Sequence, residues 1–192
     1  MTLLDYKKDI DACLKVLRNE GAILYPTDTI WGLGCDATSE KAVNKIYDIK
    51  QRCESKAFII LLSDVSQLET YVEKVPPIAL DLIEKVHTPL TIIYENVINL
   101  PGNLIPEDNT IAIRIVKNEF VKDLICAFGR PIVSTSANIS GEANPLMYAE
   151  IDSQIINSVD YVVEYMRHSI QQVQPSTIIK VEDEWNYEVI RS

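Results

Sequence analysis

The sequence predicts an α/β fold with a mixed β-sheet, formed by one domain over residues 1–192. Predicted strands alternate with helices in the first part of the chain, and strands dominate the C-terminal part. The composition, 47% hydrophobic and 24% charged residues, is that of a globular protein with a substantial core. No repeat, low-complexity tract or linker-like stretch divides the 192 residues, which favours a single domain.

Apolar spacing and capping residues predict the helices. Residues 6–20 carry apolar side chains at helical spacing, and Gly21 is a natural stop. Thr38 or Ser39 can cap a second helix, which delivers cations to its C-terminal end, where they suit the helix dipole. Residues 66–69 have the pattern of a capping box. Two further helices are predicted from Pro77 to about Val86, where proline suits the first turn, and over 119–128, with Gly129 as its stop.

Apolar runs bounded by turn residues predict the strands. Their expected positions are residues 22–25, 58–62, 90–94, 110–116 and 132–134, with three short strands near 160–164, 176–181 and 186–190.

A cluster of cations and a loop of hydroxyl groups predict an anion site. The chain has 18 Lys+Arg against 28 Asp+Glu, a net charge of -10, yet Lys50, Arg52 and Lys56 lie within seven residues. Their mutual repulsion calls for a local anion, whereas the alternative is a solvated helix end. The loop Ser134–Gly141 offers hydroxyl and amide groups, which bind phosphate or carboxylate without adding charge. We interpret the two segments as a site for a small polyanion such as a nucleotide.

The sequence gives little support for a membrane protein, a secreted protein, a metalloprotein or a dinucleotide-binding protein. The longest strongly apolar run, residues 57–62, is too short to cross a membrane, and the first residues lack the order of a signal peptide, so the cytoplasm is expected. Four scattered cysteines and two histidines indicate neither disulfides, nor a metal site, nor a His-based triad. Gly32–Ala37 matches the dinucleotide-binding pattern only weakly, and a tight bend with close backbone approach is the preferred interpretation.

Arg114 is a second candidate for binding an anion. It lies in an apolar strand and shares a strand face with Thr110. An inward-facing arginine needs an anionic partner, which is either Asp28 in a salt bridge or the carboxylate of a substrate. Asp28 belongs to a Thr-Asp-Thr turn at the end of a strand, a group suited to orient an amine or a hydroxyl.

Taken in order, several segments resemble the YrdC-like family of threonylcarbamoyl-adenylate synthases, in its short form. These segments are Tyr25–Gly34, Lys50-x-Arg52 with Ser55-Lys56, Pro89-Leu-Thr91, Thr110–Arg114, Pro131–Gly141 and Pro175–Ile179. The resemblance extends from about residue 20 to residue 192, and the order of the segments is more specific than any one of them.

The resemblance implies a twisted open sheet with flanking helices and a concave, positively charged pocket. It implies that L-threonine, bicarbonate and ATP give threonylcarbamoyl-AMP and pyrophosphate, with Mg²⁺ on the phosphates, for N6-threonylcarbamoyladenosine in tRNA. The implied macromolecular partners are downstream tRNA threonylcarbamoyl-transfer proteins, with tRNA or double-stranded RNA itself as a further candidate. The residues implied for threonine are Thr29, Arg114, Ser134 and Ser176; for ATP they are Arg52, Lys56, Thr110, Ser136, Asn138, Asn144 and Arg191; Lys50, Arg52 and Lys56 are the implied catalytic cations.

The chain departs from the family pattern at three places: Cys53 replaces a proline, Ala57-Phe58 replaces Pro-Leu, and Val86-His-Thr replaces Trp-Pro-Gly. Two alternatives stand beside the main hypothesis, and the departures bear on the second of them. One is a non-catalytic factor that binds double-stranded RNA or tRNA, which a net charge of -10 disfavours. The other is a paralogue that adenylates a different carbamate.

Overall fold

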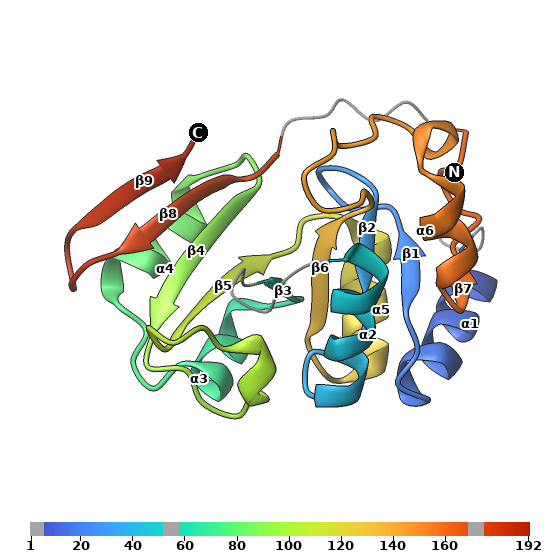
Figure 1. Ribbon diagram of the computed structural model, residues 1–192. Helices are drawn as coiled ribbons and strands as arrows, with labels where there is room; N and C mark the ends of the chain where they lie inside the picture. Colours follow the sequence, from blue (N-terminus) through green and yellow to red (C-terminus); the bar gives the residue numbers. More distant parts are fainter. Residues whose placement is uncertain (1–5, 52–57, 169–174) are drawn as a thin grey trace.

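The computed structural model describes residues 6–51, 58–168 and 175–192, and nine strands in these ranges form one mixed sheet (Figure 1). The strand order is β7-β1-β2-β6-β3-β5-β4-β8-β9. Three neighbouring pairs, β1–β7, β3–β5 and β4–β8, are parallel, and the other five are antiparallel. The strands are β1 (Ile23–Tyr25), β2 (Gly32–Gly34), β3 (Ile59–Leu62), β4 (Leu90–Glu95), β5 (Thr110–Ile115), β6 (Ile132–Ser136), β7 (Tyr161–Val162), β8 (Thr177–Val181) and β9 (Tyr187–Arg191). The α/β class and the mixed sheet are thus confirmed, whereas the single domain over residues 1–192 stays a prediction.

The helices gather at the two ends of the sheet. Helices α3 and α4 lie at the β4–β8 end, and α1, α2, α5 and α6 lie at the β1–β6 end (Figure 1). Ser39 caps α2 by accepting from the backbone N–H of Ala42, and Gly129, with φ 76°, ends α5 as predicted. The α-helices are α1 (Lys7–Arg18), α2 (Glu40–Lys50), α3 (Leu68–Tyr71), α4 (Pro77–Lys85), α5 (Glu119–Phe128) and α6 (Ser153–Ser158); short 3-10 helices cover Val65–Gln67, Gly102–Leu104 and Tyr148–Glu150.

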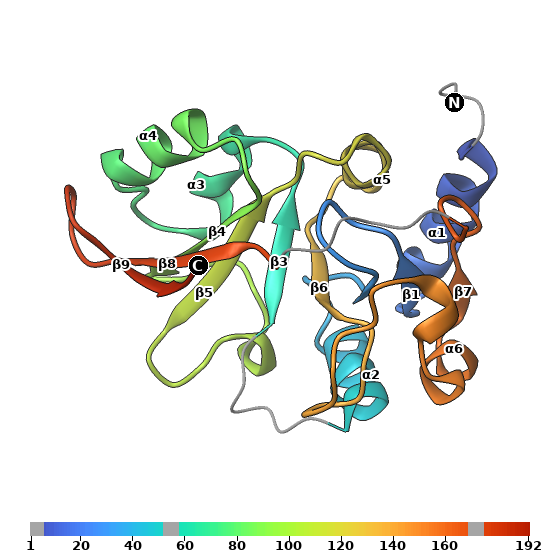
Figure 2. The same ribbon diagram turned by 90° about the horizontal axis from the view of Figure 1, so that it is seen from above.

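The core has two clusters because side chains alternate along each strand. Helices α2 and α5 lie on opposite sides of β6 (Figure 2). On one side Val133 packs in a cluster with Val43 and Ile46 of α2. On the other side Ile132 belongs to a cluster with Phe120 of α5 and with residues of α1.

The predicted bend at Gly32–Ala37 is wrong in part. Gly32–Gly34 form a short strand, β2, which hydrogen-bonds to β1 on one side and β6 on the other. The close backbone approach is confirmed, since a Cβ atom on Gly34 would lie 2.6 Å from both Tyr25 Cε1 and the Val133 carbonyl oxygen. The pattern did not reveal the strand because its glycines report close packing rather than β propensity.

Two local predictions are corrected. The capping box begins at Asp64 rather than at residue 66: Asp64 accepts from the Ser66 N–H, and the Gln67 side chain accepts from the Asp64 N–H. After α1 the left-handed residue is Glu20, with φ 58°, and not Gly21. Gly21 is needed for close packing, because a Cβ atom there would lie 2.6 Å from Val16 Cγ1.

Candidate functional site

A cavity of about 400 Å³ lies against the middle of the sheet, and seven strands contribute to its wall. It combines an apolar floor with hydroxyl groups and two guanidinium groups, the composition expected of a site for a small anionic ligand. The described residues that line it are Thr27, Thr29, Ile30, Gly32, Phe58, Ile59, Ile93, Ala112, Arg114, Ser134, Thr135, Ser136, Asn144, Pro175, Ser176, Ile178, Ile190 and Arg191.

Arg114 is buried at this wall, with 4% of its surface exposed. Its Nη2 lies 3.2 Å from Asp28 Oδ1, and its Nη1 donates to Thr29 Oγ1 at 3.3 Å. The predicted ion pair with Asp28 is therefore present. Arg114 Nε is buried and has no hydrogen-bond partner in the described part of the chain. The arginine thus has a fixed orientation and one buried donor that the described residues leave unused.

The Thr-Asp-Thr turn, residues 27–29, contacts Arg114 through Asp28 and Thr29. The Thr27 hydroxyl donates to the Ile30 carbonyl oxygen at 2.7 Å, and the Thr29 N–H donates to Thr27 Oγ1. The two threonine Oγ1 atoms are 3.0 Å apart. Both side chains line the cavity, so this turn presents a hydrogen-bonded pair of hydroxyl groups to a ligand.

Arg191 brings a second guanidinium group to the wall from β9. Its Nε and Nη2 donate to the Ser176 carbonyl oxygen at 3.2 and 2.8 Å. Burial, together with the nearby positive charge of Arg114, lowers the pKa of Arg191 from its ordinary value. Two cations that repel each other across a cavity make an anionic ligand favourable there.

Lys50 is not among the described residues that line this cavity, and its catalytic role stays a prediction. It is 2% exposed, and its Nζ donates to the carbonyl oxygens of Ser136 and Asn138 at 2.6 and 2.7 Å and to Asn138 Oδ1 at 3.2 Å. The position is a consequence of helical phase, since Lys50 falls on the buried face of α2 with Ile46. Lys50 therefore holds the loop that follows β6.

Asn138 and Thr110 also lie outside the lining set, although the resemblance assigned both to ATP. Asn138 Oδ1 accepts from Ser136 Oγ, and its Nδ2 donates to the Glu142 carbonyl oxygen, so its side chain braces the loop. The Thr110 hydroxyl donates to Asp108 Oδ1 at 2.8 Å.

The structure brings seven of the predicted site residues to one cavity. These are Thr29, Arg114, Ser134, Ser136, Asn144, Ser176 and Arg191. Arg52 and Lys56 lie outside the described residues, as do Cys53 and Ala57 of the departures from the family pattern. The roles assigned to all of these residues stay predictions.

Sequence reasoning missed the apolar floor of the cavity. Ile59, Ile93, Ala112 and Ile178 come from four neighbouring strands and face the same side of the sheet. Alternation along each strand gives the faces, but the strand order that aligns them was not available from the pattern.

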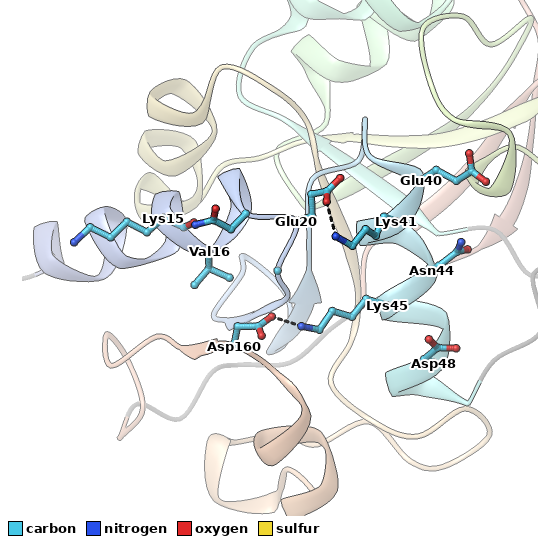
Figure 3. Close-up of a pocket in the computed structure, with 11 residues that line it drawn as sticks. Lys15, Val16, Glu20, Glu40, Lys41, Asn44, Lys45, Asp48 and Asp160 are labelled. Atoms are coloured by element: carbon cyan, nitrogen blue, oxygen red, sulfur yellow. Dashed lines mark hydrogen bonds and ion pairs between the residues drawn. The ribbon is translucent and has the colours of Figure 1, made fainter.

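A larger concavity, of about 880 Å³, lies between α1, α2 and the segment before β7 (Figure 3). Its wall carries both signs of charge. Lys41 pairs with Glu20 at 2.9 Å, and Lys45 pairs with Asp160, as the dashed lines in Figure 3 show. Because these charges neutralise one another, the smaller cavity with its two arginines is the better candidate site.

No metal-binding cluster of three or more His, Cys, Asp or Glu side chains occurs in residues 6–51, 58–168 and 175–192. In the same ranges, no helix has the length and apolar character needed to cross a membrane.

Comparisons with known proteins give a consistent result. The family model for Sua5, YciO and YrdC proteins, described as telomere recombination, matches residues 15–192. A protein of Pseudoalteromonas translucida named threonylcarbamoyl-AMP synthase is 36% identical over 185 residues, which cover 95% of this chain and 96% of that protein. A putative threonylcarbamoyl-AMP synthase of Methanocaldococcus jannaschii is 35% identical over 93% of this chain and 83% of its own length.

Solved structures show the same fold. The crystal structure of P. abyssi Sua5 complexed with L-threonine superposes with a TM-score of 0.88 at 26% identity. The match covers 96% of this chain but 54% of that one, so this chain spans about half of that protein. E. coli YciO superposes with a TM-score of 0.82 at 27% identity, over 96% of this chain and 88% of that one.

Proposed function

Because the chain belongs to the Sua5/YciO/YrdC family, we propose that it converts L-threonine, bicarbonate and ATP into L-threonylcarbamoyl-AMP and pyrophosphate. One observation carries the proposal: in a chain of net charge -10, two arginines and a group of hydroxyls surround one cavity of about 400 Å³. The relatives named threonylcarbamoyl-AMP synthase and the L-threonine bound to P. abyssi Sua5 support the choice of substrates.

For threonine, we assign the part of the cavity around Arg114. A guanidinium group is suited to bind a carboxylate, and Arg114 lines the cavity. Thr29, which accepts from Arg114, and the lining residues Ser134 and Ser176 offer hydroxyls for the amino acid's polar groups.

For ATP, we assign Ser136, Asn144 and Arg191, which line the same cavity. Arg52 and Lys56, which lie outside the described residues, are proposed to hold phosphate oxygens. Thr110 and Asn138 would then act through the backbone and loop that they stabilise.

The chemistry requires positioning more than a protein nucleophile. The threonine amine and bicarbonate form a carbamate with loss of water. A carbamate oxygen then forms a bond to the α-phosphorus of ATP, and the bond from that phosphorus to the bridging oxygen breaks, which releases pyrophosphate. Holding two anions close together and neutralising their charge supplies most of the rate enhancement in such a step.

In the proposal, Mg²⁺ enters only as an ion bound to the phosphates of ATP. The described residues offer no ligand cluster for it, and Mg²⁺ in nucleotide sites is commonly bound through the substrate's phosphates. The tRNA pathway and its downstream transfer proteins rest on the resemblance, whereas the cytoplasm as compartment rests on the N-terminal sequence.

The decisive assay measures pyrophosphate release from ATP and bicarbonate, with and without L-threonine. The proposal expects release that depends on both threonine and bicarbonate. Release without threonine, or with another amine in its place, would support a paralogue of different substrate. No release at all, with retained binding of double-stranded RNA, would support the non-catalytic alternative.

A further inference from the structure

A pair of buried hydroxyl groups lies at the wall of the cavity. Thr91 of β4 is fully buried, and its Oγ1 is 2.8 Å from Oγ of Ser176, a lining residue that is 2% exposed. Thr91 shares a strand face with the lining residue Ile93 but is not itself a lining residue. Thr91 therefore reaches the cavity through Ser176.

The direction of this hydrogen bond decides what Ser176 can offer a ligand, because each hydroxyl has one hydrogen. In the described part of the chain, Thr91 Oγ1 makes no other hydrogen bond. Its buried hydrogen is satisfied only if it is donated to Ser176 Oγ. Arg191 Nη2, which can only donate, also lies 3.4 Å from Ser176 Oγ. Ser176 Oγ then accepts from both neighbours, and its own hydrogen is left for a group in the cavity.

Backbone contacts hold Ser176 in place on two sides. The Thr177 N–H donates to the Pro89 carbonyl oxygen at 3.0 Å, which ties the start of β8 to the start of β4. The Ser176 carbonyl oxygen accepts two hydrogen bonds from Arg191. With the backbone fixed in this way, the orientation of the Ser176 hydroxyl depends on its hydrogen bonds to Thr91, at 2.8 Å, and to Arg191, at 3.4 Å.

We propose that Thr91 is a positioning residue that makes Ser176 a hydrogen-bond donor to the carboxylate of the amino-acid substrate. A carboxylate can only accept, so the opposite direction of the Thr91–Ser176 bond would present lone pairs to it. The inference rests on the proposed function and extends it, since it names a residue behind the wall that sets affinity for threonine.

The test uses three variants in the threonine-dependent assay. Thr91→Val keeps the shape and removes the hydroxyl; its KM for L-threonine rises about tenfold, which corresponds to about 1.4 kcal/mol, while kcat and the KM for ATP change less than about twofold. Thr91→Ser keeps the donor and restores most of the threonine affinity. Thr177→Val is the matched control, because it removes the hydroxyl of a neighbouring residue that does not line the cavity. The KM for threonine stays unchanged in this variant.

A double-mutant cycle separates positioning from general support of the fold. In a Ser176→Ala background, Thr91→Val adds no further rise in the KM for threonine, because its effect passes through Ser176. Additive effects, or equal rises in KM for both substrates together with a lower Tm, would overturn the inference. An active wild-type protein with unchanged KM in Thr91→Val would overturn the inference alone. A wild-type protein without threonine-dependent release would overturn the proposed function, and the inference with it.

Discussion

Arg114 Nη2 lies 3.2 Å from Asp28 Oδ1, both side chains are almost fully buried, and Arg114 lines the cavity. The pair leaves Arg114 Nε without a hydrogen-bond partner in the described residues. Asp28 thus fixes the arginine without using all of its donors. A buried arginine held in this way can bind a substrate carboxylate with little further loss of side-chain entropy.

Arg114→Ala is expected to raise the KM for L-threonine at least tenfold and to change the KM for ATP much less. The reason is the loss of a charge-assisted hydrogen bond to the carboxylate, worth about 1.5–3 kcal/mol. Steady-state kinetics with each substrate varied in turn measure the two constants. Arg18→Ala, on the exposed side of α1, is the control for a lost arginine. The opposite pattern, with ATP affected more than threonine, would contradict the assignment.

Lys50→Met is expected to lower the free energy of unfolding by about 3 kcal/mol. The substitution leaves the carbonyl oxygens of Ser136 and Asn138 without their buried cationic donor. Urea unfolding followed by circular dichroism measures the change. Lys8→Met, at an exposed position of α1, serves as control. If Lys50→Met abolished ATP binding and left stability unchanged, Lys50 would have the phosphate-binding role that its sequence position suggested.

Gly34→Ala is expected to destabilise the fold by about 2–3 kcal/mol, since its Cβ would overlap Tyr25 and the backbone of β6. Thermal melts report the change. Gly102→Ala is the matched control, because a Cβ atom at that glycine meets nothing within 4 Å. Equal Tm values for the two variants would show that β1, β2 and β6 can separate to admit a methyl group.

Tyr6 makes the free energy of unfolding depend on pH in the alkaline range. Burial and the hydrogen bond from its hydroxyl to Asp123 raise the pKa of Tyr6 to about 12. The folded state therefore keeps this proton longer than the unfolded state, whose tyrosine titrates near 10. The stability contributed by Tyr6 is complete below pH 10 and is lost as the pH rises from 10 to 12.

Tyr6→Phe should accordingly lose less stability than the wild-type protein between pH 10 and 12. Urea unfolding at a series of pH values tests this. Tyr187→Phe, at an exposed position, controls for the loss of a phenol group. Parallel curves for wild type and Tyr6→Phe would show that the Tyr6 proton is equally held in both states.

Much of the fold follows from local signals that need no partner. Ser39 and Gly129 bound their helices as predicted, because a cap is formed by the residue and the helix it ends. Strand β2 was missed because the need for glycine there comes from the close approach of β1 and β6, which the local sequence does not reveal. The burial of Lys50 could not be predicted from the sequence for a related reason, since a lysine is normally expected in water.

By itself, the sequence determined the α/β class, most strands and helices, and seven residues that share one cavity. These depend on periodicity, caps and ordered motifs along the chain. Only the tertiary structure decided that Lys50 supports a loop, that Asp28 orients Arg114, and that Thr91 stands behind Ser176. Each of these contacts joins residues 85 or more positions apart, and such a contact depends on the strand order of the whole sheet rather than on the residues near either partner.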